Sequence, residues 1–365
     1  MKLKVPQPVF LDGLSAIQNA VSSRPTNPIL TNALIVAGDG TITMTATDID
    51  MTIQCTIAAD VAKPGSTTLP AKRLAGVVGK LTGGTIEMVV DDKNVTGMRC
   101  GSANFKLNGM PASEFPPVPS TEGSTKYNLD KAVFANMLKK THYAASKDDS
   151  RPALNGVLLN FKDSKLTCVA TDGRRLALIE HEVEFPADHN RDVILPKRAV
   201  GELIRILEKQ GEGNLGIYLK GNQAIFEFDS VVMYCKLVDG VYPNFRQVIL
   251  SQCDHRITIS REELLGALGR VSEVTTEKSN AMRLTFEDNK LSIVASSPDV
   301  GAAEDELAVK YNGPKITAIF NPEFMSDPLR HLTSDEIYME LNDAMSPGLI
   351  KSDIPFLYVL MPLRI

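Results

Sequence analysis

The sequence predicts an α+β protein made of three copies of one unit, each with two helices and about eight short strands. Three observations lead to this prediction. The same sequence markers recur in the same order along the 365 residues, helical periodicity occurs twice in each copy, and short apolar runs typical of strands lie between the helices. A chain of this length also exceeds what one hydrophobic core usually serves.

Three markers define the repeat. The first ends a strand-like segment and reads Ala-Thr-Asp at 46–48 and 170–172, then Ala-Ser-Ser at 295–297. The second is helical, and its copies begin at Leu69, Leu195 and Phe320. The third closes each copy with the segments FKLNGMPASEFPPV, CKLVDGVYPNFRQVI and YVLMPLRI. Because the first two markers repeat every 124 to 126 residues, we expect three homologous domains, at 1–120, 126–250 and 254–365.

Apolar residues at helical spacing predict the first helix of each unit. The residues concerned are Phe10, Leu14, Ile17 and Val21 in the first unit and Leu129, Val133, Met137 and Leu138 in the second. In the third unit, Ser260 and Glu263 form a capping box before the apolar residues. Pro328 falls inside the second helix of that unit, so this helix either starts late, with Asp327 as its cap, or is kinked.

Composition excludes several classes of protein. No run approaches the roughly 20 apolar residues of a membrane span, and the first residues lack the apolar core of a signal peptide. The five cysteines form no CxxC pair, so disulfides and structural zinc are not expected, and the protein should be cytoplasmic. Residues 251–365 carry 18 acidic and 11 basic side chains, a charge of −7, whereas residues 1–250 carry +2, which together give the net charge of −5. The acidic side chains of 251–365 form either a solvated acidic face or a head-to-tail contact with the first unit.

No catalytic motif stands out. The five histidines lack metal-binding spacing, and GVVGK at 76–80 is too short for a phosphate-binding loop. Asp48 and Asp50 resemble a metal-binding pair, which would suit a nuclease or transferase, but the pair is not repeated in the second unit. Asp48 is better explained as the cap of a turn after a strand. We therefore expect no enzyme activity, no cofactor and no metal.

Basic residues recur at equivalent positions. Lys72 and Arg73 begin the second helix of the first unit, and Lys197 and Arg198 begin that of the second. Any one of them alone would be an ordinary solvated charge, but recurrence favours a shared basic face that contacts phosphates without reading bases. Since few aromatic residues lie between them, duplex DNA fits this face better than single strands.

The whole chain resembles the bacterial sliding clamp family, the beta subunit of DNA polymerase III. The resemblance rests on five segments spread over the three units: SRPTNPILTNALI at 23–35, ATDGRRLALIE at 170–180, KLVDGVYPNFRQVI at 236–249, FNPEF at 320–324 and YVLMPLRI at 358–365. It implies a DNA clamp fold in which each repeated domain packs two helices on antiparallel sheets. It also implies a ring-shaped head-to-tail homodimer.

Such a ring would encircle duplex DNA irrespective of sequence, and as a non-catalytic processivity factor it would tether the replicative polymerase. The implied partners are the DNA polymerase III alpha subunit, the clamp loader complex, other proteins with clamp-binding motifs and a second copy of the chain. The alternative is a duplex DNA-binding protein that does not encircle its substrate.

The resemblance also implies two sets of site residues. For DNA they are Arg24, Lys72, Arg73, Arg151, Lys197 and Arg198. For a pocket that binds partner peptides they are Leu154, Thr171, Gly173, Arg174, Arg175, Leu176, Pro243, Val248, Phe324, Met345, Pro347, Val359, Met361, Pro362 and Arg364. Apolar members would form a slot for Leu or Phe anchors, while Arg and Thr would fix the peptide backbone. Taken alone, Leu176 and Val359 are equally well explained as core residues. Pro152 and Ala153 replace aromatic residues that the family usually has before Leu154.

Overall fold

The computed structural model describes residues 1–22, 25, 27–118, 124–186, 189–209 and 211–364. Contacts between residues group the chain into two compact units. Unit 1 comprises Met1–Ala132 and Arg205–Leu237, and unit 2 comprises Val133–Ile204 and Val238–Ile365. The three domain boundaries expected from the sequence stay a prediction.

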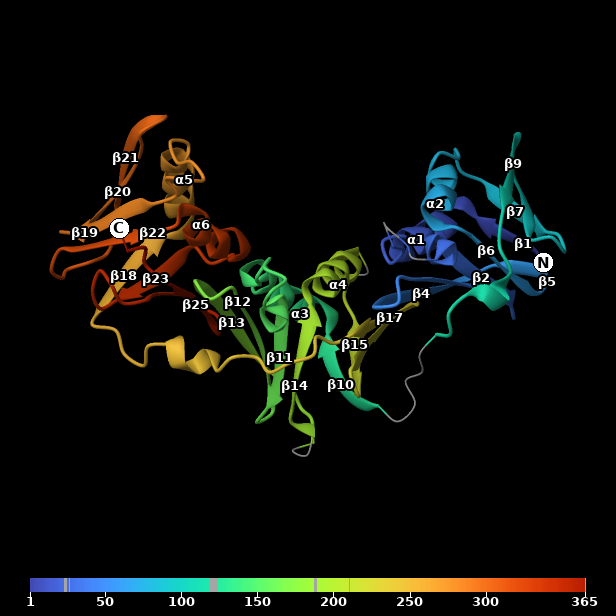
Figure 1. The fold of residues 1–365 in the computed structure, drawn as a ribbon, viewed down its shortest axis with the longest axis horizontal. Helices are drawn as coiled ribbons and strands as arrows, with labels where there is room; N and C mark the ends of the chain where they lie inside the picture. Colours follow the sequence, from blue (N-terminus) through green and yellow to red (C-terminus); the bar gives the residue numbers. More distant parts are fainter. Residues whose placement is uncertain (23–24, 26, 119–123, 187–188, 210, 365) are drawn as a thin grey trace. The chain divides into compact units, whose positions relative to one another are not determined.

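Unit 1 contains two antiparallel sheets (Figure 1). The smaller has the order β5 (Asp60–Lys63), β1 (Lys2–Pro6), β7 (Thr85–Val90), β8 (Val95–Cys100) and β9 (Ala103–Asn108). The larger has the order β10 (Thr125–Asp130), β15 (Asn214–Lys220), β16 (Gln223–Phe228), β17 (Val231–Lys236), β4 (Met51–Ala58), β3 (Thr41–Thr47), β2 (Asn32–Gly38) and β6 (Gly65–Pro70). Strands from two sequence repeats thus share the larger sheet.

Unit 2 repeats this plan. Its larger sheet has the order β14 (Arg191–Pro196), β11 (Gly156–Lys162), β12 (Lys165–Thr171), β13 (Arg175–Glu182), β25 (Phe356–Leu360), β24 (Gly348–Lys351), β23 (Glu336–Leu341) and β18 (His255–Ser260). Its smaller sheet has the order β21 (Gly301–Ala308), β20 (Lys290–Ser297), β19 (Met282–Glu287) and β22 (Ile316–Phe320). The α+β class predicted from the sequence is confirmed.

Each sequence repeat contributes two α-helices, as predicted. They are α1 (Gln7–Ile17), α2 (Ala71–Gly79), α3 (Lys131–Lys139), α4 (Lys197–Lys209), α5 (Arg261–Ser272) and α6 (Pro322–His331). Phe10, Leu14 and Ile17 of α1 are fully buried, whereas Val21 lies beyond the helix end. Leu129, also expected in a helix, belongs to β10. The Ser260 half of the predicted capping box is confirmed, since its hydroxyl accepts a hydrogen bond from the Glu263 backbone N–H.

The same kind of two-residue turn connects β2 to β3 in unit 1, and β11 to β12 and β19 to β20 in unit 2. Its two central residues are Asp39-Gly40, Asp163-Ser164 and Asp288-Asn289, and all six have a positive φ between 48° and 71°. Two positive φ values in succession match the twist of the flanking strands, and Gly, Asp and Asn tolerate them best. This turn is a fourth marker of the repeat.

One strand pairing joins segments about 180 residues apart in unit 2. Strand β13 pairs antiparallel with β25, in register from Arg175 opposite Leu360 to Ile179 opposite Phe356. Figure 1 shows the red β25 beside the green β13. The pairing makes one continuous sheet from strands of the second and third repeats. Residues 361–364 follow directly after β25.

A pair of glycine substitutions tests the packing of unit 2. A Cβ at Gly156 would lie 2.3 Å from the Leu195 carbonyl oxygen of the neighbouring strand, while one at Gly201, in α4, would meet no atom within 4 Å. Gly156→Ala should therefore lower the free energy of unfolding by about 1–3 kcal/mol. Gly201→Ala should raise it by about 0.5–1 kcal/mol, because glycine is a poor helix former. Urea unfolding of the two variants measures both, and a stable Gly156→Ala variant would contradict this close packing of β11 on β14.

Candidate partner pocket and basic residues

An apolar cluster covers one face of the larger sheet in unit 2. Its buried members are Leu158, Val169, Leu176, Leu178, Ile194, Phe245, Leu349 and Val359. Cross-strand pairs build it, because Leu158 lies opposite Val169 and Leu176 lies opposite Val359. The segment 238–253, which links the second and third repeats, packs against it through Tyr242, Ile249 and Leu250. Leu176 and Val359 therefore form part of the core beneath the predicted pocket.

Several predicted pocket residues keep apolar side chains at the surface near this cluster. Met361 is 39% exposed, Val248 40% and Met345 54%. Such exposed apolar side chains next to a buried apolar cluster are typical of a binding surface. Of the other predicted residues, Leu154 is buried, Pro243 and Arg364 are exposed, and Pro347 and Pro362 are half-buried.

The equivalent junction in unit 1 is polar. There, β4 pairs with β17, and Thr52 lies opposite Tyr234 where unit 2 has Leu176 opposite Val359. Likewise, Thr45 pairs with Gln54 where unit 2 pairs Val169 with Leu178. The Gln54 amide donates to the Thr45 hydroxyl at 3.3 Å, so these side chains satisfy one another. The same backbone arrangement therefore offers an apolar surface in only one of the two units.

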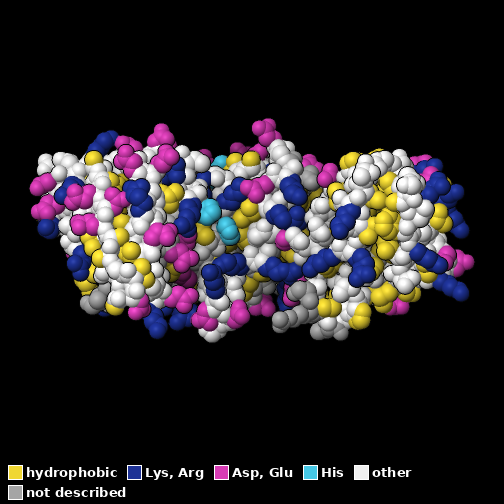
Figure 2. All heavy atoms as spheres, turned by 90° about the horizontal axis from the view of Figure 1, so that it is seen from above, with side chains coloured by type: hydrophobic (Ala, Val, Ile, Leu, Met, Phe, Trp, Pro, Cys, Tyr) yellow, Lys and Arg dark blue, Asp and Glu magenta, His cyan; other side chains and the backbone are white. Residues whose placement is uncertain are grey.

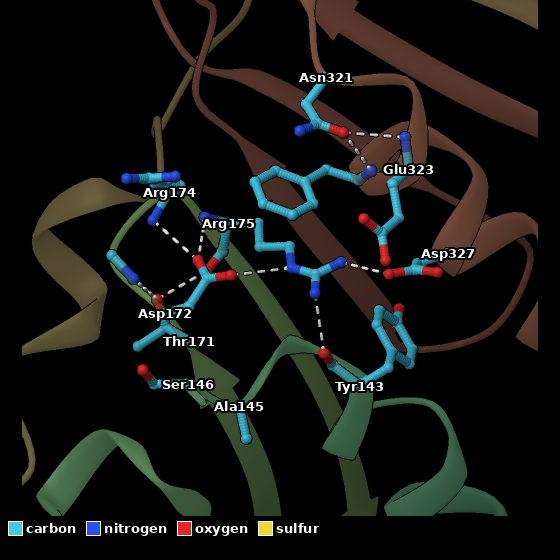
Figure 3. Close-up of polar contacts among 12 residues, drawn as sticks. Tyr143, Ala145, Ser146, Thr171, Asp172, Arg174, Arg175, Asn321, Glu323 and Asp327 are labelled. Carbon is cyan, nitrogen blue, oxygen red and sulfur yellow. Dashed lines mark hydrogen bonds and ion pairs between the residues drawn. The ribbon is translucent and has the colours of Figure 1, made fainter. Parts of the chain in front are cut away.

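The turn between β12 and β13 is held by its own side chains (Figure 3). The Asp172 carboxylate accepts hydrogen bonds from the backbone N–H groups of Arg174 and Arg175, at 2.9 and 3.1 Å. The Thr171 hydroxyl accepts from the Gly173 N–H and donates to the Arg175 carbonyl. Gly173 has φ 88°, a conformation that favours glycine. The turn is thus rigid, and it presents the exposed Arg174 side chain.

The chain end is tied to this turn. The Met361 N–H donates to the Arg174 carbonyl at 2.9 Å, and the Leu363 N–H donates to the Ile319 carbonyl at 2.7 Å. The Met361 bond continues the pairing of β25 with β13, and the Leu363 bond connects the chain end to β22 of the smaller sheet. Met361 follows the cluster member Val359 by two residues, so it lies on the same side of the strand.

Arg175 is buried, with 7% of its surface exposed, and is bonded inside the protein. Its Nε donates to the Asp172 carboxylate at 3.1 Å, its Nη1 to the Asp327 carboxylate and its Nη2 to the Tyr143 carbonyl at 2.9 Å. Although burial works against its charge, the aromatic hydroxyl of Tyr358 and the two carboxylates raise the pKa of Arg175 above its ordinary value. Of the three arginines expected in the pocket, Arg174 and Arg364 are exposed to solvent, whereas Arg175 is not.

Helix α6 begins earlier than one interpretation of the sequence allowed. Its cap is Asn321, whose side chain accepts from the N–H groups of Glu323 and Phe324, and Pro328 lies within the helix. The late start with Asp327 as cap is therefore wrong. Pro328 has no N–H to donate to the Phe324 carbonyl four residues earlier. The Tyr358 hydroxyl of β25 donates to that carbonyl instead, at 2.8 Å.

The predicted DNA-contacting residues lie at helix starts. Lys72 and Arg73 are exposed in the first turn of α2, and Arg198 is exposed in the first turn of α4. Lys197 is half-buried and donates to the Ala145 carbonyl at 2.9 Å. Burial, followed by the charge of Lys147, lowers the pKa of Lys197. Arg24 lies outside the described residues.

Arg151 lies beside the pocket turn. Its Nη1 is 3.7 Å from the position that a Cβ would take at Gly173. It precedes the short helix Pro152–Leu154, whose Leu154 is buried and whose Ala153 packs against the apolar cluster. The loop that departs from the family pattern at Pro152 and Ala153 thus belongs to the pocket region.

Asp48 has a structural role. Its carboxylate accepts from the Met51 N–H at 2.8 Å, as Asp172 does in the second repeat. The prediction that it caps a turn is confirmed. Within the described ranges, no three His, Cys, Asp or Glu side chains are grouped to hold a metal ion. None of the helices in those ranges is long and apolar enough to cross a membrane.

Comparisons with known proteins agree with this geometry. Family models of the N-terminal, central and C-terminal domains of the DNA polymerase III beta subunit match residues 1–119, 128–244 and 246–364. The beta sliding clamp of Chlamydia muridarum is 30% identical over 352 residues, which covers 96% of each chain. The chain belongs to this family.

Solved structures give the same result. The sliding clamp of Bartonella birtlesii bound to griselimycin superposes with a TM-score of 0.95 at 34% identity, over 100% of both chains. The clamp of Pseudomonas aeruginosa bound to griselimycin also reaches 0.95, at 29% identity over 100% of both chains. The clamp fold and the function of a DNA sliding clamp, both implied by the sequence resemblance, are confirmed.

Sequence reasoning missed the polar residues behind the pocket. Tyr143 stacks on His331, with ring centroids 4.7 Å apart, and His142 lies edge-on to His331 at 6.0 Å. Two more members are Tyr358, whose hydroxyl donates to the Phe324 carbonyl, and Asp327, whose carboxylate accepts from Arg175. The one local signal was Pro328, because a proline inside a helix leaves a carbonyl that needs another donor.

The histidine pair predicts a pH dependence. Burial lowers the pKa of both His142 and His331, and for His331 the neighbouring His142 adds to the effect. A histidine whose pKa is depressed on folding binds protons more readily when unfolded, so stability is full above the unfolded pKa and falls as pH drops. The urea midpoint should decrease between about pH 7.5 and about pH 5.5. It should decrease less in a His142→Gln/His331→Gln variant, and an equal decrease in both proteins would contradict the assignment.

Proposed function

We propose that two copies of this chain join head to tail into a ring that encircles duplex DNA and, without catalysing a reaction, tethers a polymerase to it. The observation that carries this proposal is the clamp fold with two unpaired strand edges of opposite charge. Strand β9 ends the smaller sheet of unit 1, and β21 ends that of unit 2. Unpaired edges are templates for pairing with another chain.

The two edges complement each other. Strand β9 carries the exposed Lys106 between half-buried Phe105 and Leu107, while Arg99 of the neighbouring β8 pairs with Glu87 of the same sheet. Strand β21 carries Glu304, Asp305 and Glu306, of which Asp305 pairs with Arg270 and Glu306 with Lys290. In Figure 2, acidic side chains gather on the part of unit 2 formed by the C-terminal residues. Since unlike edges meet, the contact is heterologous, and two such contacts close a dimer into a ring.

The placement of basic residues supports sequence-independent DNA contact. Lys72, Arg73 and Arg198 lie in the first turns of α2 and α4, where the helix dipole disfavours positive charge. Helix stability therefore does not explain why these cations recur at the same position in two repeats. Phosphate contact does, because a cation that neutralises a phosphate releases counterions whatever the sequence. Weak contacts of this kind allow a ring to slide.

The apolar cluster beneath Met361 and Val248 supports a peptide-binding role. We propose that its ligands are the clamp-binding segments of the DNA polymerase III alpha subunit, the clamp loader and other proteins with such motifs. The exposed Arg174 and Arg364 at its rim would then bond the peptide backbone. Two solved relatives are bound to griselimycin, and we propose that this chain binds it at the apolar cluster.

Encirclement has a topological test. The protein is loaded by a compatible clamp loader onto nicked circular DNA, the complex is isolated, and the circle is cut once at constant salt. A ring held only by topology should leave the linear DNA by sliding off its ends, while an uncut circle retains it. Retention on both forms would show that the protein grips DNA directly, and the ring would be rejected in favour of a protein that does not encircle DNA.

The pocket is tested with Met361→Ala/Val248→Ala. Removing two exposed apolar side chains should weaken binding of griselimycin or of an alpha-subunit peptide by about 2 kcal/mol or more, measured by calorimetry. Val89→Ala serves as a control, since Val89 is also exposed, at 51%, but lies on β7 in unit 1. Equal affinities in wild type and the double variant would remove the pocket from this face of the sheet.

A further inference from the structure

We propose that Asp327 and Tyr358 are positioning residues of the partner pocket, which set the place of Phe324 from behind without touching the ligand. This inference rests on the proposed peptide-binding function. The two residues belong to the third repeat, and their role is to hold a pocket residue in place, whereas the pocket residues contact the ligand. The argument follows from the contacts of Arg175 and of helix α6.

Arg175 connects the two walls of the pocket. Towards β12 it bonds Asp172, whose other oxygen holds the turn that presents Gly173 and Arg174. Towards α6 it bonds Asp327, and its guanidinium carbon lies 4.2 Å from the centre of the Phe324 ring. Figure 3 shows Arg175 between Asp172 and Asp327, above Tyr143. A planar guanidinium bonded on three sides has one orientation, so the turn and α6 are held at a fixed separation.

Tyr358 supplies the second connection. Because Pro328 has no N–H, it cannot donate a hydrogen bond to the Phe324 carbonyl. The Tyr358 hydroxyl donates to that carbonyl at 2.8 Å. Tyr358 is fully buried, so its hydroxyl has no access to water. Phe324 is thus fixed at its carbonyl by β25 and at its ring by Arg175.

The two carboxylate oxygens of Asp327 have different partners. Oδ2 accepts from the buried Arg175, and Oδ1 accepts at 3.3 Å from Arg330, which is 57% exposed. A pair with an exposed side chain contributes little, whereas removing the half-buried carboxylate of Asp327 leaves the charge of the buried Arg175 less well balanced. Of these two contacts of Asp327, the one with Arg175 connects α6 to the turn between β12 and β13, and Arg330 therefore offers a matched control.

Binding and positioning are thermodynamically linked. If the Asp327–Arg175 contact strengthens ligand binding by some factor, ligand binding strengthens the contact by the same factor. A bound ligand should therefore reduce hydrogen exchange of the α6 backbone in the wild type. This protection distinguishes a positioning role from a merely structural one, because a structural contact would change stability and leave the affinity of the folded protein unaltered.

The experiment compares griselimycin affinity by calorimetry in wild type, Asp327→Asn and Tyr358→Phe, at a temperature where each is folded. Both variants should bind about 10-fold more weakly or worse, within the 5–150-fold range of measured couplings. Ligand-dependent protection of α6 should shrink in both. Tyr358→Phe keeps the ring and removes only the hydroxyl, so it tests the proposal even where Asp327→Asn folds poorly.

Two controls complete the design. Arg330→Gln removes the exposed partner of Asp327 and should leave affinity unchanged. Asp229→Asn removes the carboxylate that pairs with buried Lys131 in unit 1, so it should lower the melting temperature without changing affinity. If Asp327→Asn and Tyr358→Phe behave like Asp229→Asn, the positioning role is wrong.

The outcomes separate this inference from the proposed function. Failure of the wild type to bind griselimycin and an alpha-subunit peptide would reject the pocket itself. In another outcome, the wild type binds, Met361→Ala/Val248→Ala does not, and Asp327→Asn and Tyr358→Phe bind with full affinity. That outcome would support the pocket and reject only the positioning role.

Discussion

The backbone pairing of β13 with β25 is the constraint on which the functional part of unit 2 depends. It joins a strand from the middle of the chain to the strand near its end, and five residue pairs fix the register. Because side chains alternate between the two faces of a strand, a shift of one residue would move Val359 away from the apolar cluster. The same pairing places Met361 against Arg174 and Tyr358 against α6. The pocket is therefore a consequence of one register.

Repetition of a backbone does not repeat a function here. Units 1 and 2 build equivalent eight-stranded sheets, and in each a strand of one repeat pairs with a strand of the next. At the junction, unit 1 places Thr52 opposite Tyr234, and unit 2 places Leu176 opposite Val359. In unit 1 the Thr52 hydroxyl shares a hydrogen bond with that of Thr47 at 2.7 Å, whereas the apolar pair of unit 2 joins a buried apolar cluster. The same backbone arrangement thus presents different side-chain chemistry in the two units.

A buried polar group beneath an apolar pocket has a cost, because each charge must be paired once water is excluded. Arg175 meets this requirement with two carboxylates and a carbonyl, and its guanidinium lies over the Tyr143 ring, which stacks on His331. Directional bonds give this region one arrangement, which apolar packing alone enforces less strictly. For the proposed peptide binding, a fixed arrangement of these groups would lower the entropy lost when the peptide binds.

The sequence by itself determined the threefold repeat, the six helices, the Ser260 cap and the recurrence of cations at helix starts, since all of these are encoded by spacing along the chain. The family resemblance added a set of expected pocket residues, which stays a prediction. The sequence could not show that Arg175 is bonded inside the protein, that Arg151 lies beside Gly173, or that Tyr358 satisfies the carbonyl freed by Pro328. Arg175 and Asp327 are 152 residues apart, and no local pattern records a contact over such a distance. Only the tertiary structure, by fixing the register of β13 on β25, decided which of these side chains meet.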